Sequence, residues 1–245
     1  MRRSLLGLSF LLFFPTLVFG AGAIVGVDNP AKVCGTVSAK VCGAAVTPAA
    51  SSCSYVHCNG FEAQTDDDDW TTVSGTPDFD DLSWGMEGLE GLEFPTGNNA
   101  VVSIAVTARA ETWITFMLRF NDNNESLENL VLLYNDSTLL GTLLQEHDAL
   151  IKVQAEGGTL TAGETVAAHS SIFYLKLRFK QGTGANAELE FWACTDGQTW
   201  TQNLSSTDGT STAQVNKIVI QNTHDNEVMW IDNFMENSAD ITDAR

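Results

Sequence analysis

The sequence predicts an all-β protein, an antiparallel β-sandwich of the jelly-roll type, preceded by a cleaved signal peptide and a short cysteine-containing segment. Three observations lead to this prediction. The first residues have the layout of an export signal, four cysteines cluster before residue 59, and short alternating apolar and polar stretches follow from there. We therefore expect a signal peptide over 1–23, a cysteine-rich leader over 24–58 and a jelly-roll domain over 59–245.

The N-terminal segment has the features of a secretory signal peptide. Arg2 and Arg3 form a charged start, residues 5–19 are apolar apart from a few small or polar positions, and small residues follow at 20–23. A transmembrane anchor would need about 20 apolar residues, and this stretch is shorter and contains Pro15. We expect cleavage near residue 20 or 23, and a secreted protein, extracellular or periplasmic, with no membrane insertion after cleavage.

The chain is strongly acidic. It carries 31 Asp and Glu against 12 Lys and Arg, a net charge of −19, and loss of the two arginines of the signal peptide makes this about −21. Binding to nucleic acid requires clustered Lys and Arg to neutralise phosphates, so a nucleic-acid partner is excluded. An anionic membrane surface is unfavourable for the same reason, and the charge itself favours solubility.

Four cysteines, Cys34, Cys42, Cys53 and Cys58, lie within 25 residues of one another. In an exported protein this cluster predicts two disulfides, with three connectivities open. A zinc site is the alternative, because Lys-Val-Cys-Gly occurs twice, but the spacing contains no Cys-x-x-Cys pair and disulfides are favoured. Cys194 stands apart from the cluster and is predicted to be a buried free thiol.

The domain contains eight segments that alternate between apolar and polar residues, as strands do. They are 100–108, 112–120, 129–134, 149–155, 172–180, 188–193, 215–222 and 227–234. Residues 138–145 fit a strand or a short helix, and no convincing helical period occurs elsewhere. Antiparallel strands joined by hairpin turns over this length predict a sandwich in one domain.

Alternation also assigns the two faces of the hairpin around "QGTGAN". The side chains predicted to point into the core are Phe173, Leu175, Leu177, Phe179, Leu189, Phe191 and Ala193. Those predicted to point outward are Tyr174, Lys176, Arg178, Lys180, Glu188, Glu190 and Trp192. A register that places Arg178 opposite Glu188, Lys176 opposite Glu190 and Tyr174 opposite Trp192 pairs opposite charges and two aromatic rings across the strands.

The stretch "FYLKLRFKQGTGANAELEFWACTDGQTW", with "NKIVIQN" and "MWIDNF" after it, resembles the concanavalin A-like lectin/glucanase (jelly-roll) superfamily, in particular secreted bacterial carbohydrate-binding-type domains. In that superfamily a strand, a "GTG-N" hairpin, a second strand and a "DG-x-x-W" turn precede a closing strand ending in "DN" and an apolar residue. The "GFE" of residues 60–62, with Trp70, resembles the opening strand. The resemblance covers residues 59 to 240 and implies the fold more firmly than the function.

The resemblance also implies a structural calcium ion. In related carbohydrate-binding modules the Glu of the opening "FE" and the Asp of the closing "DN" share the ion, and these positions correspond to Glu62 and Asp232. Calcium takes about six to eight oxygen ligands, and the first and last strands lie side by side. The alternative is that both carboxylates lie in solvent or accept backbone hydrogen bonds. The aspartates at 66–69 are predicted to form a solvated turn, because adjacent side chains diverge.

The catalytic motifs of related enzymes are incomplete in this chain. Glucanases carry an E-x-D-x-E strand, whereas Glu188 and Glu190 have no third acid. Alginate lyases on a similar fold carry an Arg-x-Glu-x-Arg strand and a Gln-x-His pair, but Arg109 and Glu111 lack the second arginine and Gln221 lacks the histidine. The sequence therefore favours a protein without catalysis, and "TDGQTW" is interpreted as a hairpin turn with a packing tryptophan.

The favoured function is a secreted, non-catalytic protein for glycan binding or surface adhesion, with a polysaccharide or glycan surface as its partner. Aromatic rings stack on sugars, and cations pair with uronates or sulfates. The candidate ligand-binding residues are Trp113, Arg119, Tyr174, Lys176, Arg178 and Trp192. An ion-pair ladder on an ordinary sheet face is the favoured interpretation of the cations, and it is compatible with a binding platform. The alternative functions are a diverged polysaccharide hydrolase or lyase and an envelope structural protein without a small ligand.

Overall fold

The computed structural model describes residues 40–41, 44–45, 57–59, 61, 69–81, 90–97, 99–121, 127–146, 150–166, 171–223 and 227–244. All of these fall within one compact unit, Ala31–Arg245. None of the described residues belongs to a helix long and apolar enough to cross a membrane. The predicted signal peptide and three of the clustered cysteines (Cys34, Cys42 and Cys53) lie outside the described residues, and only the backbone of Cys58 is described, so the disulfides stay a prediction.

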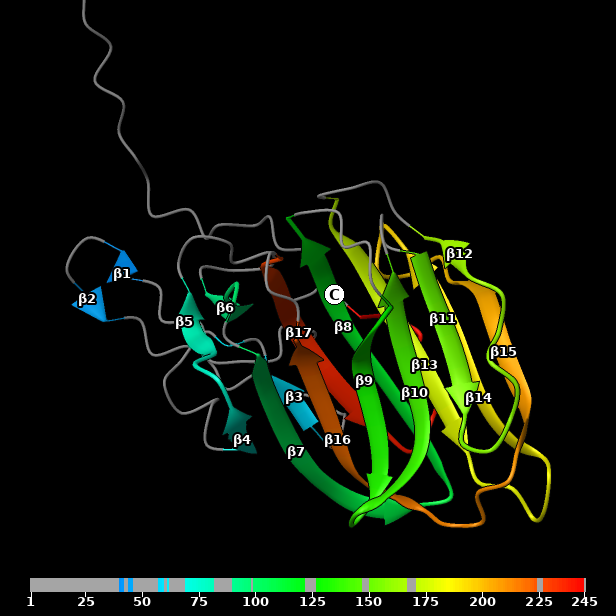
Figure 1. The fold of residues 1–245 in the computed structure, drawn as a ribbon. Helices are drawn as coiled ribbons and strands as arrows, with labels where there is room; N and C mark the ends of the chain where they lie inside the picture. Colours follow the sequence, from blue (N-terminus) through cyan, green and yellow to red (C-terminus); the bar gives the residue numbers. More distant parts are fainter. Residues whose placement is uncertain are drawn as a thin grey trace, which may run out of the picture. The chain divides into compact units, whose positions relative to one another are not determined.

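Two antiparallel sheets form a β-sandwich (Figure 1). The first has seven strands in the order β12-β11-β10-β9-β16-β7-β4. Its strands are β4 (Trp70–Ser74), β7 (Ala100–Arg109), β9 (Glu128–Asn135), β10 (Thr138–Glu146), β11 (Leu150–Ala155), β12 (Glu164–Thr165) and β16 (Val215–Asn222). A separate two-stranded sheet joins β1 (Lys40–Val41) to β2 (Ala44–Ala45).

The second sheet has eight strands, seven of them in the order β15-β14-β13-β8-β17-β6-β5, with β3 paired to β17. Its strands are β3 (His57–Asn59), β5 (Asp78–Asp81), β6 (Gly91–Phe94), β8 (Glu111–Phe120), β13 (Phe173–Lys180), β14 (Ala187–Cys194), β15 (Thr201–Gly209) and β17 (Met229–Asn237). The predicted antiparallel β-sandwich is confirmed, and the ambiguous segment 138–145 is a strand, because β10 pairs with β9 on one edge and β11 on the other.

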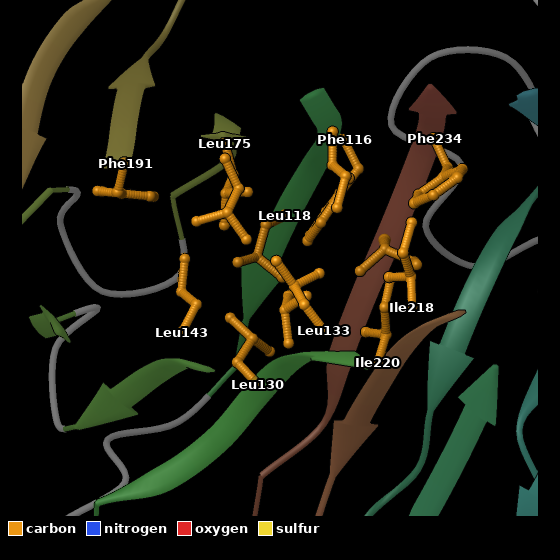
Figure 2. Packing of buried hydrophobic residues seen from close by; sticks show 14 of the residues in the cluster. Phe116, Leu118, Leu130, Leu133, Leu143, Leu175, Phe191, Ile218, Ile220 and Phe234 are labelled. Atoms are coloured by element: carbon orange, nitrogen blue, oxygen red, sulfur yellow. The ribbon is translucent and has the colours of Figure 1, made fainter. Parts of the chain in front are cut away.

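The hydrophobic core lies between the two sheets, where side chains from both layers converge (Figure 2). The eight-stranded sheet contributes Phe116, Leu118, Leu175, Phe191 and Phe234. The seven-stranded sheet contributes Leu130, Leu133, Leu143, Ile218 and Ile220. Each of these side chains is almost completely buried, and complete burial of one such side chain is worth about 1.5–3 kcal/mol.

The β13–β14 hairpin confirms the predicted faces but not the predicted register. The core-facing residues of both strands are buried, as alternation requires. However, Arg178 lies opposite Glu190, Lys176 opposite Trp192 and Tyr174 opposite Cys194, so the predicted pairing is wrong by two residues. The strands continue pairing up to Lys180 and Glu188, because the turn closes tightly with Asn186 N–H donating to the Gly184 carbonyl at 2.9 Å. A shift of two residues leaves every side chain on its predicted face.

Strand β17 contains a bulge that changes its partners and its faces. Its register against β8 shifts by one residue between Asp232 and Met235, and Asn233 has a φ of 51°. Before the bulge β17 pairs with β6, and after it β17 pairs with β3. The extra residue turns both Phe234 and Glu236 toward the interior, where each is fully buried.

The two sheets are joined at the edge where β11 and β15 meet. Ala155 N–H donates to Ser206 Oγ at 3.1 Å, and Thr210 N–H donates to the Glu156 carbonyl at 2.8 Å. Gly209 lies so close to β11 that an added Cβ would be 2.5 Å from the Cβ of Ala155. The close approach and the hydrogen bonds close this side of the sandwich.

Candidate functional site

Four of the six candidate residues come together on the outer face of the eight-stranded sheet. Trp113 projects from β8, Lys176 and Arg178 from β13, and Trp192 from β14. In the register of the sheet, Arg178 lies between Trp113 and Glu190, and Lys176 lies next to Trp192. The alternation of these three adjacent strands therefore produces one continuous patch.

The centre of this patch is the ammonium group of Lys176, which lies among three tryptophan rings. Its Nζ is 5.4 Å from the ring centroid of Trp113, 5.3 Å from that of Trp192 and 4.7 Å from that of Trp200. We call these three rings, together with Lys176, the tryptophan cage. The rings of Trp113 and Trp192 are 5.4 Å apart with planes tilted by 32°. An ammonium this close to several ring faces is stabilised by cation–π attraction.

The third ring of the cage, Trp200, is positioned by the turn that follows β14. Asp196 Oδ1 accepts the backbone N–H groups of Gln198 at 2.9 Å and Thr199 at 2.7 Å, and its Oδ2 accepts the Thr199 hydroxyl at 2.6 Å. The hydrogen bond from the Thr199 side chain, followed by the two backbone bonds, holds the pKa of Asp196 well below its usual range. The predicted hairpin turn is confirmed, and its tryptophan packs on Lys176.

Arg178 lies at one side of the cage and is surrounded by carboxylates. Its Nε is 2.8 Å from Glu111 Oε1, its Nη1 is 3.0 Å from Glu188 Oε2, and it also pairs with Glu190. Burial lowers the pKa of Arg178, but the hydrogen bonds to Glu190 and Glu111 outweigh burial, so the pKa is raised. The ion-pair ladder is present, although Lys176 does not take part in it through Glu190 as predicted: its carboxylate partner is Asp240 at 2.8 Å.

The outer face next to the cage is covered by the segment that follows β17, residues 238–244. Ala244 packs against Met117 and Tyr174, its N–H donates to the Gly197 carbonyl at 3.0 Å, and its carbonyl accepts the side-chain amide of Asn233 at 2.7 Å. Met117 projects from β8 on this face of the sheet. Tyr174 is therefore buried beneath this segment and is not available to a ligand on the sheet surface.

Arg119 lies far from the cage, although it projects from the same strand as Trp113. Six residues along a strand separate the two by about 20 Å. The guanidinium of Arg119 lies 5.4 Å from the ring centroid of Trp230. Because Tyr174 is covered and Arg119 is distant, the cage consists of Trp113, Lys176 and Trp192 from the prediction plus Trp200, with Arg178 at its side.

A second pair of charges lies inside the sandwich. Arg109, at the end of β7, forms an ion pair with Glu236 of β17, whose side chain is fully buried. Burial raises the pKa of Glu236 to about 7, although the charge of Arg109 acts in the opposite direction. The two residues that the lyase motif would require together, Arg109 and Glu111, are thus directed to different partners: Glu236 in the interior and Arg178 on the outer face.

The predicted calcium ligands are only partly described. Asp232 is fully buried beside the bulge of β17, and its Oδ1 accepts the N–H of Asn233 at 2.6 Å. Glu62 lies outside the described residues. Within the described part of the chain, no group of three or more His, Cys, Asp and Glu side chains is arranged to hold a metal ion.

Cys194 is a free thiol, as predicted, but it is not a core residue. It projects from the outer face of β14, opposite Tyr174, and is half-buried against the cluster of Met117, Tyr174 and Ala244. Burial raises the pKa of its thiol.

The comparisons with known proteins agree with the fold. No protein-family model and no curated protein sequence matches the chain. Among solved structures, the cellulose induced protein Cip1 matches with a TM-score of 0.53 at 10% identity, over 75% of this chain and 98% of that one. The metal-free carbohydrate recognition domain of Emp46p gives 0.49 at 12% identity, over 75% and 95%. The endo-β-1,4-glucuronan lyase of the fungus Trichoderma reesei gives 0.47 at 10% identity, over 78% and 94%.

The likeness to Cip1 shows a shared fold at very low sequence identity. The solved structures therefore support the predicted fold and no more than the fold.

Proposed function

We propose that the protein is a secreted, non-catalytic glycan-binding β-sandwich whose ligand stacks on the tryptophan cage. The observation that carries the proposal is the gathering of three partly exposed tryptophan rings around one cation on a single sheet face. Sugar rings present apolar C–H faces that pack on aromatic planes, while their hydroxyl groups bond to polar side chains at the edge. Gln202, which is exposed and donates to Glu190 Oε1 at 2.7 Å, is such an edge group.

The carboxylates beside the cage support binding rather than bond cleavage. Glu111, Glu188 and Glu190 all pair with the same guanidinium, that of Arg178. Cleavage of a glycosidic bond or abstraction of a proton requires an acid or base that can exchange a proton with the substrate. Three carboxylates held by Arg178, one of which also pairs with Lys180, are better suited to fixing the orientation of the rings than to transferring protons.

The fold itself does not decide between binding and cleavage, because one architecture serves many functions. We therefore test the two possibilities separately. Incubation of the protein without its signal peptide with glucans, alginates and galactans should release neither reducing ends nor unsaturated products. Release of either product would show that the protein is an enzyme and would overturn the proposal.

Binding is tested by titration calorimetry with cellotetraose and with acidic tetrasaccharides. Trp192→Ala removes one ring of the cage and should weaken binding about two- to tenfold, as expected for the loss of one aromatic contact of about 0.5–1.5 kcal/mol. Tyr134→Ala is a matched control, because Tyr134 is a partly exposed ring with Lys217 Nζ at 4.7 Å on the seven-stranded sheet. Equal weakening by both variants would exclude the cage as the binding site.

The proposal includes a structural calcium ion held by Glu62 and Asp232. Support comes from the buried carboxylate of Asp232 and from ring contacts that link Phe61, which precedes Glu62 in the sequence, to the strand that carries Asp232. The ring of Phe61 lies 6.1 Å from that of Trp70, which lies 5.0 Å from that of Phe234. Calcium supplies the charge that two carboxylates at a strand seam need. Calcium should raise the melting temperature and EDTA should lower it. If Glu62→Ala and Asp232→Ala leave this response unchanged, the ion is bound elsewhere.

A further inference from the structure

We propose that Asp240 occupies the position of an anionic group of the ligand, so that the tryptophan cage recognises an acidic sugar through Lys176. The ligand class is a glycan with a carboxylate or a sulfate, and Asp240 is its internal competitor. This inference rests on the proposed glycan-binding function and specifies its ligand.

The side chain of Lys176 is enclosed by the rings of the tryptophan cage and the segment that follows β17. Only 4% of its side chain is exposed, and its Nζ contacts three ring faces, the Asp240 carboxylate at 2.8 Å and the Ile241 carbonyl at 3.5 Å. A buried ammonium requires an anion, because removing a charge from water without a partner is costly. Asp240 supplies that anion.

Asp240 can move away from Lys176 while its segment stays in place. The Asp240 side chain is 47% exposed, and within the described residues its carboxylate contacts Lys176 alone. The residues after it are anchored separately: the Thr242 carbonyl accepts the indole N–H of Trp200 at 3.2 Å, and Asp243 accepts the side-chain amide of Gln198. Rotation of one exposed side chain would therefore uncover the ammonium without detaching the segment.

The surroundings of Arg178 differ from those of Lys176. The carboxylates that neutralise Arg178 belong to β8 and β14 of the sheet itself, so they cannot move away as a group. They would also repel an anion placed beside them. An incoming anionic group is therefore confined to the Lys176 side of the cage, where the existing carboxylate is on a segment outside the sheet.

Exchange of one anion for another preserves the charge balance of the cage. A ligand carboxylate or sulfate oxygen replaces Asp240 Oδ1 at Lys176 Nζ, the sugar ring lies against the tryptophan rings, and Asp240 turns into solvent. Because the free protein is partly closed by its own carboxylate, its apparent affinity is lower than the intrinsic affinity of the open cage. Removing the competing charge should raise the apparent affinity for acidic ligands alone.

The experiment compares Asp240→Asn with the wild-type protein by titration calorimetry at low salt. The probes are tetragalacturonate, a sulfated neocarratetraose and neutral cellotetraose. We expect Asp240→Asn to bind at least one acidic probe about two- to fivefold more tightly, the range that follows from losing one ion pair with a half-exposed partner. Cellotetraose should bind both proteins equally. Tightening for tetragalacturonate alone assigns the subsite to a carboxylate, and tightening for both acidic probes assigns it to the negative charge.

Asp243→Asn is the matched control, because it changes another acid of the same segment while leaving the Lys176–Asp240 contact intact. Equal tightening by Asp243→Asn would mean that loosening the segment, not removing the charge, is responsible, and would overturn the inference. If the wild-type protein binds any probe but Asp240→Asn binds both acidic probes no more tightly than the wild-type protein does, the inference is overturned. The proposed function stands in that case. Absence of binding for all three probes in both proteins refutes the proposed function together with the inference.

Discussion

The buried pair of Arg109 and Glu236 gives the sharpest prediction of this structure. The two side chains come from opposite sheets, with 14% of Arg109 and none of Glu236 exposed. Glu236 Oε2 has no hydrogen-bond partner among the described residues, so Arg109 is the main compensation for its charge. Arg109→Met keeps most of the side-chain length and removes the positive charge. Breaking a buried ion pair on one side costs about 3–5 kcal/mol, because the remaining charge is uncompensated.

The cost depends on pH through the proton on Glu236. Burial raises the pKa of Glu236 from 4.5 to about 7 in the folded protein. Between these values the folded state holds a proton that the unfolded chain has lost, so the contribution of Glu236 to stability is fully present below pH 4.5 and falls as pH rises. The total loss by pH 8 is about 3 kcal/mol, at roughly 1.4 kcal/mol per pH unit. Arg109→Met should therefore cost much less at pH 5 than at pH 8.

The assay is urea unfolding followed by tryptophan fluorescence and far-UV circular dichroism at several values of pH. Glu236→Gln removes the titrating group, so the stability of the wild-type protein minus that of Glu236→Gln should fall by about 3 kcal/mol between pH 4.5 and pH 8. Lys152→Met is the control for a partly exposed pair, since Lys152 lies 2.6 Å from Glu146, and should cost at most about 1 kcal/mol. An Arg109→Met cost that is the same at pH 5 and pH 8, or a wild-type minus Glu236→Gln difference that does not fall, would refute this account.

Three further predictions concern packing and the turn that positions Trp200. Gly209→Ala should destabilise the protein by about 1–3 kcal/mol, because the added Cβ meets Ala155 at 2.5 Å, whereas Gly184→Ala has open space and should leave the melting temperature unchanged. Phe191→Ala should cost about 3–5 kcal/mol in urea unfolding, and Val73→Ala, at a position 59% exposed, less than about 0.5 kcal/mol. Asp196→Ala should lower the melting temperature at pH 7. The difference in melting temperature between the wild-type protein and this variant should narrow as pH falls below 3.8, because the pKa of Asp196 is depressed in the folded state. A difference in melting temperature that is independent of pH would contradict this prediction.

The central strands were predictable because apolar residues alternate with other residues along them, and the apolar side packs into the core. Strand β15 escaped prediction because it lies at the sheet edge and exposes polar residues on most of its length. Strand β6 is absent from the predicted strands because it is short, although Leu92 and Phe94 are fully buried. The register of the β13–β14 hairpin was wrong because alternation is unchanged by a shift of two residues, so only the turn geometry decides it.

The cage was partly predictable for a related reason. Trp113, Lys176 and Trp192 lie on the outward positions of neighbouring strands, so the strand pattern alone brings them together. Trp200 and Asp240 come from irregular segments, and no periodic pattern predicts where such residues lie in space. The same segment that carries Asp240 also covers Tyr174, a long-range contact that the local sequence around Tyr174 does not encode.

The bulge in β17 reverses which residues of the strand, odd-numbered or even-numbered, point into the core. The bulge at Asn233 lies about halfway along the last strand. Before the bulge β17 pairs with β6 and after it with β3, so β17 connects both short strands to β8 and the rest of the sheet. If β17 continued through Asn233 as a regular strand, Phe234 and Glu236 would point to the outer face of the sheet, as Trp230 and Asp232 do. The bulge thus directs both the aromatic ring of Phe234 and the carboxyl group of Glu236 into the interior of the sandwich. Because Glu236 binds a proton there, the bulge also makes the stability of the protein depend on pH.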